Sequence, residues 1–223
     1  MTLWSEFLGN NHRTINKWAH YFPAYEAHLN RFVNRPALLL EIGSGRGGSA
    51  QMWKRYLGPL AQIVSIDINP ECKEFEEDQI AFRIGSQSDV SFLAKVLEEF
   101  GTPNIVLDDG SHHMSAVTET FRFLYPRTAS DGVYVVEDLH TAYWSEFGGG
   151  LKHEGTFIEL AKGLVDELNA DWTRGELAPT EFTRATLSMH FYDSMVVFER
   201  GRHLEKRNLR ISGRQNLIRG IVP

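Results

Sequence analysis

Short apolar segments rich in β-branched residues alternate with segments of helical periodicity along most of the chain, and this alternation constrains the fold more than any other feature. The expected strands are residues 37–43, 62–68, 80–85, 104–109 and 132–138. Each is nearly continuous in apolar residues, as is typical of strands that helices cover on both faces of a sheet. The pattern predicts an α/β fold with a doubly wound, mostly parallel sheet rather than a β-sandwich.

The helical segments between these strands have recognisable ends. Residues 89–101 carry apolar side chains at helical spacing, with Asp89 in position to cap the first turn. A second helix is expected over residues 114–126, where Pro126 ends it because proline cannot continue the hydrogen-bonding pattern. A third is expected over residues 156–170, after the glycine-rich "FGGG".

The end of the expected sheet changes character. Residues 185–201 contain two apolar stretches separated by a turn at 192–194, which predicts an antiparallel hairpin after the parallel strands. No repeat or linker divides the chain, so we expect one domain over residues 1–223. Its three expected parts are an N-terminal helical cap (1–35), a Rossmann-like core (36–200) and a basic C-terminal segment (201–223).

The composition indicates what kind of partner the protein has. A formal net charge of -6 gives no electrostatic reason to bind nucleic acid or an anionic membrane, so the expected partner is a small molecule. The single cysteine, the absence of a secretion signal and the lack of any run of roughly 20 apolar residues indicate a soluble, cytoplasmic protein. The basic tail is interspersed with apolar residues, which favours a packed segment or a homo-oligomer contact over a nucleic-acid site.

The glycine-rich stretch "EIGSGRGGSA" (41–50) lies where the first strand must turn into the first helix. Glycines there let the backbone adopt positive φ and approach a ligand, beside the free N–H groups of a helix N-terminus. The predicted cofactor contacts in this turn are Gly43, Ser44, Gly45, Gly47 and Ser49. Gly43, Gly45 and Gly48 also satisfy the dinucleotide pattern G-x-G-x-x-G, so a nicotinamide-dependent oxidoreductase is an open alternative.

Polar residues at the ends of the first three strands indicate which nucleoside cofactor binds. Asp67 ends the second strand about 20 residues beyond the glycines, where a carboxylate can accept hydrogen bonds from both ribose hydroxyls. Glu41 places an anion beside the glycine turn, which would repel a pyrophosphate and attract the ammonium and sulfonium of S-adenosylmethionine. Ser86 and Gln87 follow the third strand and are placed to contact an adenine, whereas Asp89 is either a further adenine contact or only a helix cap.

Acidic residues gather at the ends of the fourth and fifth strands, with Asp108 and Asp109 on one and Glu137 and Asp138 on the other. The carboxyl ends of these strands are neighbours in a doubly wound sheet. Four carboxylates there repel one another unless a hard divalent cation with oxygen ligands neutralises them. Because consecutive strand residues point to opposite faces, Glu137 and Asp138 can converge only if the strand ends between them.

The two histidines after this acidic stretch bear on the identity of the cation. His112 and His113 are adjacent and lack the i, i+4 spacing with which a helix presents two imidazoles to zinc. Magnesium, calcium or manganese is therefore favoured, and one histidine is free for acid–base chemistry because its pKa is near neutrality. In the competing interpretation, Ser111 caps the following helix and the histidines pack or face solvent.

At these motifs the chain resembles the magnesium-dependent sugar O-methyltransferases of macrolide biosynthesis, of the mycinamicin and macrocin type. The broader relatives are the rhamnosyl O-methyltransferase and cephalosporin hydroxylase group. The matching stretches are residues 17–32, 39–53, 63–72, 108–113 and 134–144. The last two, "DDGSHH" and "YVVEDLHTAYW", are much more specific than the glycine turn.

The resemblance implies the class I S-adenosylmethionine-dependent methyltransferase fold. It implies a Mg²⁺ ion held by Asp109, Glu137 and Asp138, with His112 as the catalytic base, and we assign Asp108 to the cofactor site. The implied activity is magnesium-assisted methylation of a hydroxyl of a sugar or polyol in a secondary metabolite, such as a macrolide-type glycoside. The alternatives are an NAD(P)-dependent oxidoreductase and a noncatalytic Rossmann-like binding module.

Aromatic residues follow the second pair of acids. Tyr143 and Trp144 predict an aromatic wall for a ring-shaped substrate, with the "FGGG" stretch (147–150) as a mobile lid. The alternative is a plain loop anchored in the core.

Overall fold

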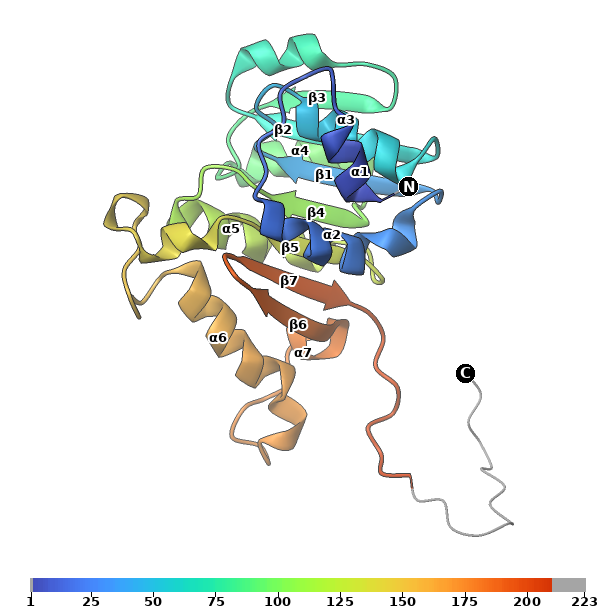
Figure 1. The fold of residues 1–223 in the computed structure, drawn as a ribbon. Helices are drawn as coiled ribbons and strands as arrows, with labels where there is room; N and C mark the ends of the chain where they lie inside the picture. The colour runs from blue at the N-terminus through green and yellow to red at the C-terminus, as the bar shows by residue number, and fades with distance from the viewer. Residues whose placement is uncertain (1, 210–223) are drawn as a thin grey trace, which may run out of the picture.

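Seven strands form one sheet, with helices on both of its faces (Figure 1). The computed structural model describes residues 2–209. The strands are β1 (Ala37–Ile42), β2 (Ala61–Asp67), β3 (Ile80–Ile84), β4 (Ile105–Asp108), β5 (Val133–Val136), β6 (Thr186–Tyr192) and β7 (Met195–Arg200). Their order is β3-β2-β1-β4-β5-β7-β6, with β7 antiparallel to β5 and β6 and the remaining pairs parallel.

The predicted doubly wound, mostly parallel sheet with a C-terminal antiparallel hairpin is confirmed. The strand order reverses between β1 and β4, and open α/β sheets bind their ligands at such a switch point. At the end of β1, Ile42 pairs with Ile66 of β2 and with Asp108 of β4. The carboxyl ends of these three strands therefore meet at one edge of the sheet.

Strands β4 and β5 end one to two residues earlier than the sequence predicts, at Asp108 and Val136. The last backbone contact between them is a 2.9 Å hydrogen bond from Glu137 N to Asp108 O. Asp138 then adopts a φ of 53°, a left-handed conformation that non-glycine residues rarely take. This turn takes the chain out of the sheet immediately after Glu137, so Glu137 and Asp138 lie beyond the strand.

Two sets of helices cover the two faces of the sheet. The helices are α1 (Leu3–Leu8), α2 (Phe22–Leu29), α3 (Gly48–Leu57), α4 (Val90–Phe100), α5 (Met114–Leu124), α6 (Phe157–Leu168) and α7 (Glu181–Ala185). Short 3₁₀ turns are η1 (Ala19–Tyr21), η2 (Asn30–Phe32), η3 (Pro70–Phe75), η4 (Tyr125–Arg127), η5 (Leu139–Tyr143), η6 (Ser145–Phe147) and η7 (Ala170–Trp172). Leu39 packs with buried residues of α1, α2 and α3, and the adjacent Leu40 packs with those of α4, α5 and α6, because neighbouring strand residues point to opposite faces.

The ends of the helices follow the expected signals. The Asp89 side chain accepts hydrogen bonds from Ser91 N (2.9 Å) and Phe92 N (3.1 Å), so its role as the cap of α4 is confirmed. Helix α5 ends at Leu124, and Pro126 lies in the 3₁₀ turn that follows. Its N-cap is His113, which makes no side-chain capping bond, so the interpretation of Ser111 as the cap is wrong.

The segment between α1 and α2, residues 9–18, crosses the ligand-binding edge of the sheet. Arg13 Nη1 donates to Phe75 O at 2.7 Å, which ties the segment to η3. Thr14 O lies so close to Gly48 that a Cβ built on this glycine would be 2.1 Å away. This packing holds Lys17, which follows in the same segment, above the ends of β4 and β5.

The C-terminal residues leave the sheet after β7. Residues 201–209 have no regular secondary structure, and Lys206 Nζ lies 2.6 Å from Asp171 Oδ2. Most of the predicted packed or oligomer-forming tail, residues 210–223, lies outside the described residues. Within residues 2–209, every helix is too short or too polar to span a membrane.

Candidate active site

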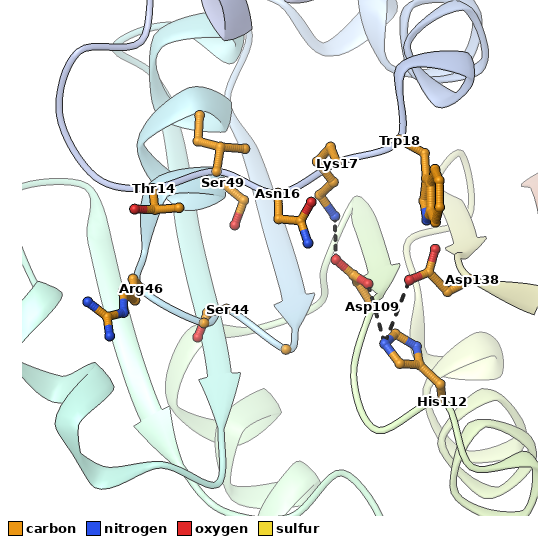
Figure 2. Close-up of a pocket in the computed structure, with 13 residues that line it drawn as sticks. Thr14, Asn16, Lys17, Trp18, Ser44, Arg46, Ser49, Asp109, His112 and Asp138 are labelled. Atoms are coloured by element: carbon orange, nitrogen blue, oxygen red, sulfur yellow. Dashed lines mark hydrogen bonds and ion pairs between the residues drawn. The ribbon is translucent and has the colours of Figure 1, made fainter. Parts of the chain in front are cut away.

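Two cavities flank Gly43 at the carboxyl ends of the parallel strands. The first has a volume of about 380 Å³ and lies between the glycine turn, the N-terminal segment and the residues after β4 and β5. Figure 2 shows the side chains that line it. The second has a volume of about 230 Å³ and lies between the ends of β2, β3 and β4. Together they form the candidate site.

The glycine turn forms the border between the two cavities. Gly43, Gly45 and Gly47 have φ values of 83°, 49° and 70°, so the predicted need for positive φ is confirmed at all three. A Cβ on Gly43 would lie 2.0 Å from Asp109 O, so only glycine lets β1 approach the end of β4 this closely. Of the other predicted cofactor residues in the turn, Ser44 and Ser49 line the first cavity.

The second cavity brings together the residues predicted to contact the nucleoside. Asp67, Ser86 and Gln87 line it. The Asp67 carboxylate accepts hydrogen bonds from Gly45 N at 3.1 Å and Asn69 N at 2.9 Å, which holds it at the border with the glycine turn. Asp89 does not line the cavity.

Glu41 and Asp108 lie elsewhere than predicted. Both are buried (0% and 1% exposed) and line neither cavity. Glu41 accepts hydrogen bonds from Trp53 Nε1 (3.1 Å) and Ser65 Oγ (2.9 Å), so it points under α3 instead of toward the ligand edge. The reason is that β1 and β4 continue to Ile42 and Asp108, which leaves the two acids inside the strands.

Burial raises the pKa of these two acids. It raises the pKa of Asp108 to about 7, against the opposing effect of a 3.1 Å hydrogen bond from Gln87 Nε2. Gln87 Oε1 in turn accepts from Ser111 N at 2.7 Å. Gln87 therefore links Asp108 and the second cavity to the loop that carries His112. Burial likewise raises the pKa of Glu41.

The first cavity contains a cluster of two carboxylates and an imidazole. Asp109, His112 and Asp138 each offer one ligand atom, and these atoms lie within 4.8 Å of one another. His112 Nε2 is 3.9 Å from Asp109 Oδ1 and 3.7 Å from Asp138 Oδ2, as the dashed lines in Figure 2 mark. His112 has a φ of 58°, a strained backbone conformation of the kind that persists at functional sites.

Lys17 is the functional residue that the sequence analysis missed. Its Nζ donates to Asp109 Oδ2 at 2.6 Å and to Glu137 Oε2 at 2.7 Å (the first contact is drawn in Figure 2), and its side chain is 2% exposed. Of the predicted metal set, the cluster therefore contains Asp109 and Asp138, whereas Glu137 is turned toward Lys17. The one signal in the sequence was the lysine that opens the matching stretch at 17–32.

The chain holds Asp138 in place through Tyr21. The Tyr21 hydroxyl donates to Asp138 Oδ1 at 2.8 Å and accepts from Asp138 N at 3.1 Å. Burial raises the pKa of Tyr21 well above its ordinary value, so the hydroxyl keeps its proton for this bond. Tyr21, which lies in η1, thus fixes the orientation of Asp138 in the cluster.

A row of ring contacts leads from Trp18, which lines the first cavity, to Trp144. Trp18 packs edge-on against His140 (5.8 Å between ring centroids), and His140 packs against Trp144 at 4.8 Å. The ring centroid of Phe147, in η6, lies 6.4 Å from that of His112. Tyr143, which the sequence placed in the same wall as Trp144, lines a different cavity next to Ser194.

The fold and this edge define a class of protein. A seven-stranded sheet with an antiparallel β7 between β5 and β6, and a glycine turn after β1 at the switch point, is the class I methyltransferase fold. The chain superposes on the MycE methyltransferase of the mycinamycin pathway, solved in complex with Mg and SAH, with a TM-score of 0.78 and 32% identity. The superposition covers 90% of this chain and 54% of that one. No protein-family model matches the chain.

Curated relatives include sugar O-methyltransferases. The chain is 40% identical over 205 residues to 8-demethyl-8-(2-methoxy-alpha-L-rhamnosyl)-tetracenomycin-C 3'-O-methyltransferase of Streptomyces olivaceus, which covers 85% of this chain and 52% of that protein. It is 35% identical over 202 residues to mycinamicin VI 2''-O-methyltransferase of Micromonospora griseorubida, covering 83% of this chain and 49% of the relative. The chain thus spans about half the length of these relatives. The resemblance predicted from the sequence is confirmed.

Proposed function

We propose that this chain is an S-adenosylmethionine-dependent, Mg²⁺-assisted O-methyltransferase that acts on a hydroxyl of a sugar or polyol in a secondary metabolite, such as a macrolide-type glycoside. The observation that carries this proposal is the cluster of Asp109, His112 and Asp138 directly beside the glycine turn. The relatives support it, because they include O-methyltransferases of a rhamnosyl-tetracenomycin and of mycinamicin VI.

In this proposal, each of the two cavities binds one part of the cofactor. Asp67, Ser86 and Gln87 line the second cavity with the polar groups that a ribose and an adenine require. Gly43 lines both cavities, so the sulfonium end of the cofactor passes the glycine turn into the first. The MycE methyltransferase, which was solved with SAH, supports this placement.

The residues of the first cavity fit a magnesium ion. Asp109 and Asp138 supply carboxylate oxygens, the ligands that Mg²⁺ prefers. Glu137, the third predicted ligand, is held beside Asp109 by Lys17. A divalent ion held by these residues would supply Lewis-acid chemistry, which lowers the pKa of an acceptor hydroxyl.

His112 is the proposed base. Its imidazole lies within 4 Å of two carboxylates, and a nearby negative charge stabilises the imidazolium that forms when the ring accepts a proton. The oxygen-rich cluster suits magnesium, whereas an imidazole ligand suits zinc and similar metals, which leaves His112 Nε2 free for the acceptor hydroxyl. The proton therefore passes from the hydroxyl to His112 as the methyl group moves to oxygen.

A direct assay tests the proposal. The protein is incubated with S-adenosylmethionine, Mg²⁺ and a panel of rhamnosylated and deoxysugar-bearing polyketides, and mass spectrometry follows a gain of one methyl group with release of S-adenosylhomocysteine. Calorimetric titration with S-adenosylhomocysteine and with NAD separates this function from the oxidoreductase alternative. Binding of NAD without binding of S-adenosylhomocysteine would contradict the proposal.

Replacement of Trp144 tests the aromatic wall. Trp144→Ala removes an exposed ring that packs on His140, which packs on Trp18 of the first cavity, and is expected to raise KM for the glycoside about three- to tenfold with little change in kcat. Trp172→Ala is the matched control, because Trp172 is 66% exposed and lies in η7, outside this set of ring contacts. Equal KM values for the two variants would remove Trp144 from the acceptor site.

The assembly of the chain is a further part of the proposal. We expect a homo-oligomer that takes no nucleic acid, on the basis of the net charge of -6 and the basic, partly apolar tail. Light scattering on the full chain measures the oligomeric state, and a monomer at all concentrations would contradict it.

A further inference from the structure

Lys17 is a buried cation that the proposed chemistry does not use. It comes from the N-terminal segment, 92 residues from Asp109 and 120 residues from Glu137 along the chain. Its ammonium lies between the two carboxylates at 2.6 and 2.7 Å, and the side chains of Lys17 and Glu137 are 2% and 1% exposed. A buried charge bridge of this kind needs a function or a compensating structure, because desolvating three charged groups is unfavourable.

The bridge uses one oxygen of each carboxylate. Lys17 contacts Asp109 Oδ2, while Asp109 Oδ1 faces His112 Nε2 at 3.9 Å. It contacts Glu137 Oε2, and the rest of the Glu137 carboxylate is buried against the Tyr25 hydroxyl. Asp109 is therefore the carboxylate of the bridge that also belongs to the cluster with His112 and Asp138.

The charges around the first cavity are consistent with one further cation. The Lys17 ammonium contacts Asp109 and Glu137, and Asp138 adds a further acid on the other side of His112. A divalent ion in the cluster of Asp109, His112 and Asp138 would place positive charge on the side of Asp109 that Lys17 does not contact.

The segment that carries Lys17 is itself fixed. Asn10 Nδ2 donates to Arg13 O at 2.8 Å, and Arg13 is bound to Phe75 O and paired with Glu77 Oε2 at 3.1 Å. Lys17 is therefore preorganised and loses little side-chain entropy in holding the carboxylates.

We propose that Lys17 is a positioning residue of the metal site, which holds Asp109 by Oδ2 and so presents Asp109 Oδ1 to the divalent ion. The inference rests on the proposed function, because it assumes that an ion binds at this edge. Glu137 is the second anchor of the Lys17 ammonium in this arrangement. Lys17 acts through Asp109 and does not contact the acceptor.

Divalent-ion affinity measured without turnover tests the inference. Mn²⁺ is titrated into the full chain, and the free ion is followed by electron paramagnetic resonance, with calorimetry of Mg²⁺ as the second measurement. Lys17→Met, of similar length and without charge, is expected to weaken ion binding about 10–100-fold, as loss of a group that orients metal ligands does. The control is Lys95→Met, since Lys95 is exposed on α4, and its affinity is expected to equal that of the wild type.

The direction of the change separates positioning from competition. If Lys17 merely competed with the ion for the carboxylates, Lys17→Met would bind Mn²⁺ more tightly, and that result or an unchanged affinity would overturn the inference. Lys17→Arg keeps the positive charge but replaces the compact ammonium with a planar guanidinium. It is expected to weaken ion binding by a smaller factor than Lys17→Met, and it tests the inference if Lys17→Met does not fold. If the wild type binds no divalent ion, the proposed metal function fails together with the inference. If the wild type binds the ion and Lys17→Met binds it equally well, only the inference about Lys17 fails.

Discussion

Asp109→Ala is expected to remove both divalent-ion binding and methyl transfer. Asp109 contacts residues on both sides of the site, because its Oδ2 is bonded to Lys17 and its Oδ1 faces His112. Its loss removes a proposed metal ligand and leaves the Lys17 ammonium with one carboxylate partner instead of two. We expect kcat/KM to fall by at least about 10²–10⁴, the range for loss of an acid–base group, and Mn²⁺ binding to become undetectable in the same titration.

His112→Ala separates the base from the metal ligands. We expect it to lower kcat by about 10²–10⁴ while Mn²⁺ affinity stays within a few-fold of the wild type, since oxygen ligands hold the ion. Asp131→Ala, an exposed acid just before β5, is the control for both variants and should leave activity unchanged. Turnover that survives Asp109→Ala and His112→Ala would exclude the proposed chemistry, and loss of ion binding in His112→Ala would make the imidazole a ligand instead of a base.

Gly43→Ala is expected to have the second large effect, on both stability and cofactor binding. A Cβ on Gly43 would lie 2.0 Å from Asp109 O and 2.7 Å from its carbonyl carbon, both of which are backbone atoms that cannot rotate away. The end of β1 must therefore separate from the end of β4, which moves the glycine turn and Asp109 together. We expect a loss of about 2–4 kcal/mol in the free energy of unfolding, from overpacking and the positive φ, and no detectable binding of S-adenosylhomocysteine.

Gly45→Ala is the matched control for Gly43→Ala. Gly45 also has a positive φ, of 49°, but a Cβ there would meet nothing within 4 Å. Only the conformational cost of about 1 kcal/mol is therefore expected. Urea unfolding gives both free energies, and calorimetry gives the cofactor affinity. Equal destabilisation of the two variants would mean that steric contact with Asp109 does not constrain the turn.

The sequence predicted the fold and half of the site because those features depend on neighbouring residues. The strand and helix patterns, the cap at Asp89 and the positive φ values at Gly43, Gly45 and Gly47 are all local. Asp109 and His112 are three residues apart, so their proximity is also a local feature. Asp138 joins them in the cluster. Asp67, Ser86 and Gln87 share a cavity because each follows a strand that ends at the same edge.

The sequence did not reveal where side chains near the strand ends point. Glu41 and Asp108 lie inside the strands that the sequence predicts, and both are buried in the interior. Successive strand residues point to opposite faces, and both faces of these strands are apolar and covered. The pattern therefore does not show which way an acid near the end of such a strand points, so these two assignments depended on the structure.

By itself, the amino-acid sequence determined the alternating β and α elements, the glycine turn and the set of acids after β4 and β5, because periodicity, backbone freedom and charge are properties of short segments. Only the tertiary structure decided that Lys17 bridges Asp109 and Glu137 and that Tyr21 holds Asp138. These contacts join residues 92 to 120 positions apart, and the packing of the N-terminal segment across the sheet edge brings them together.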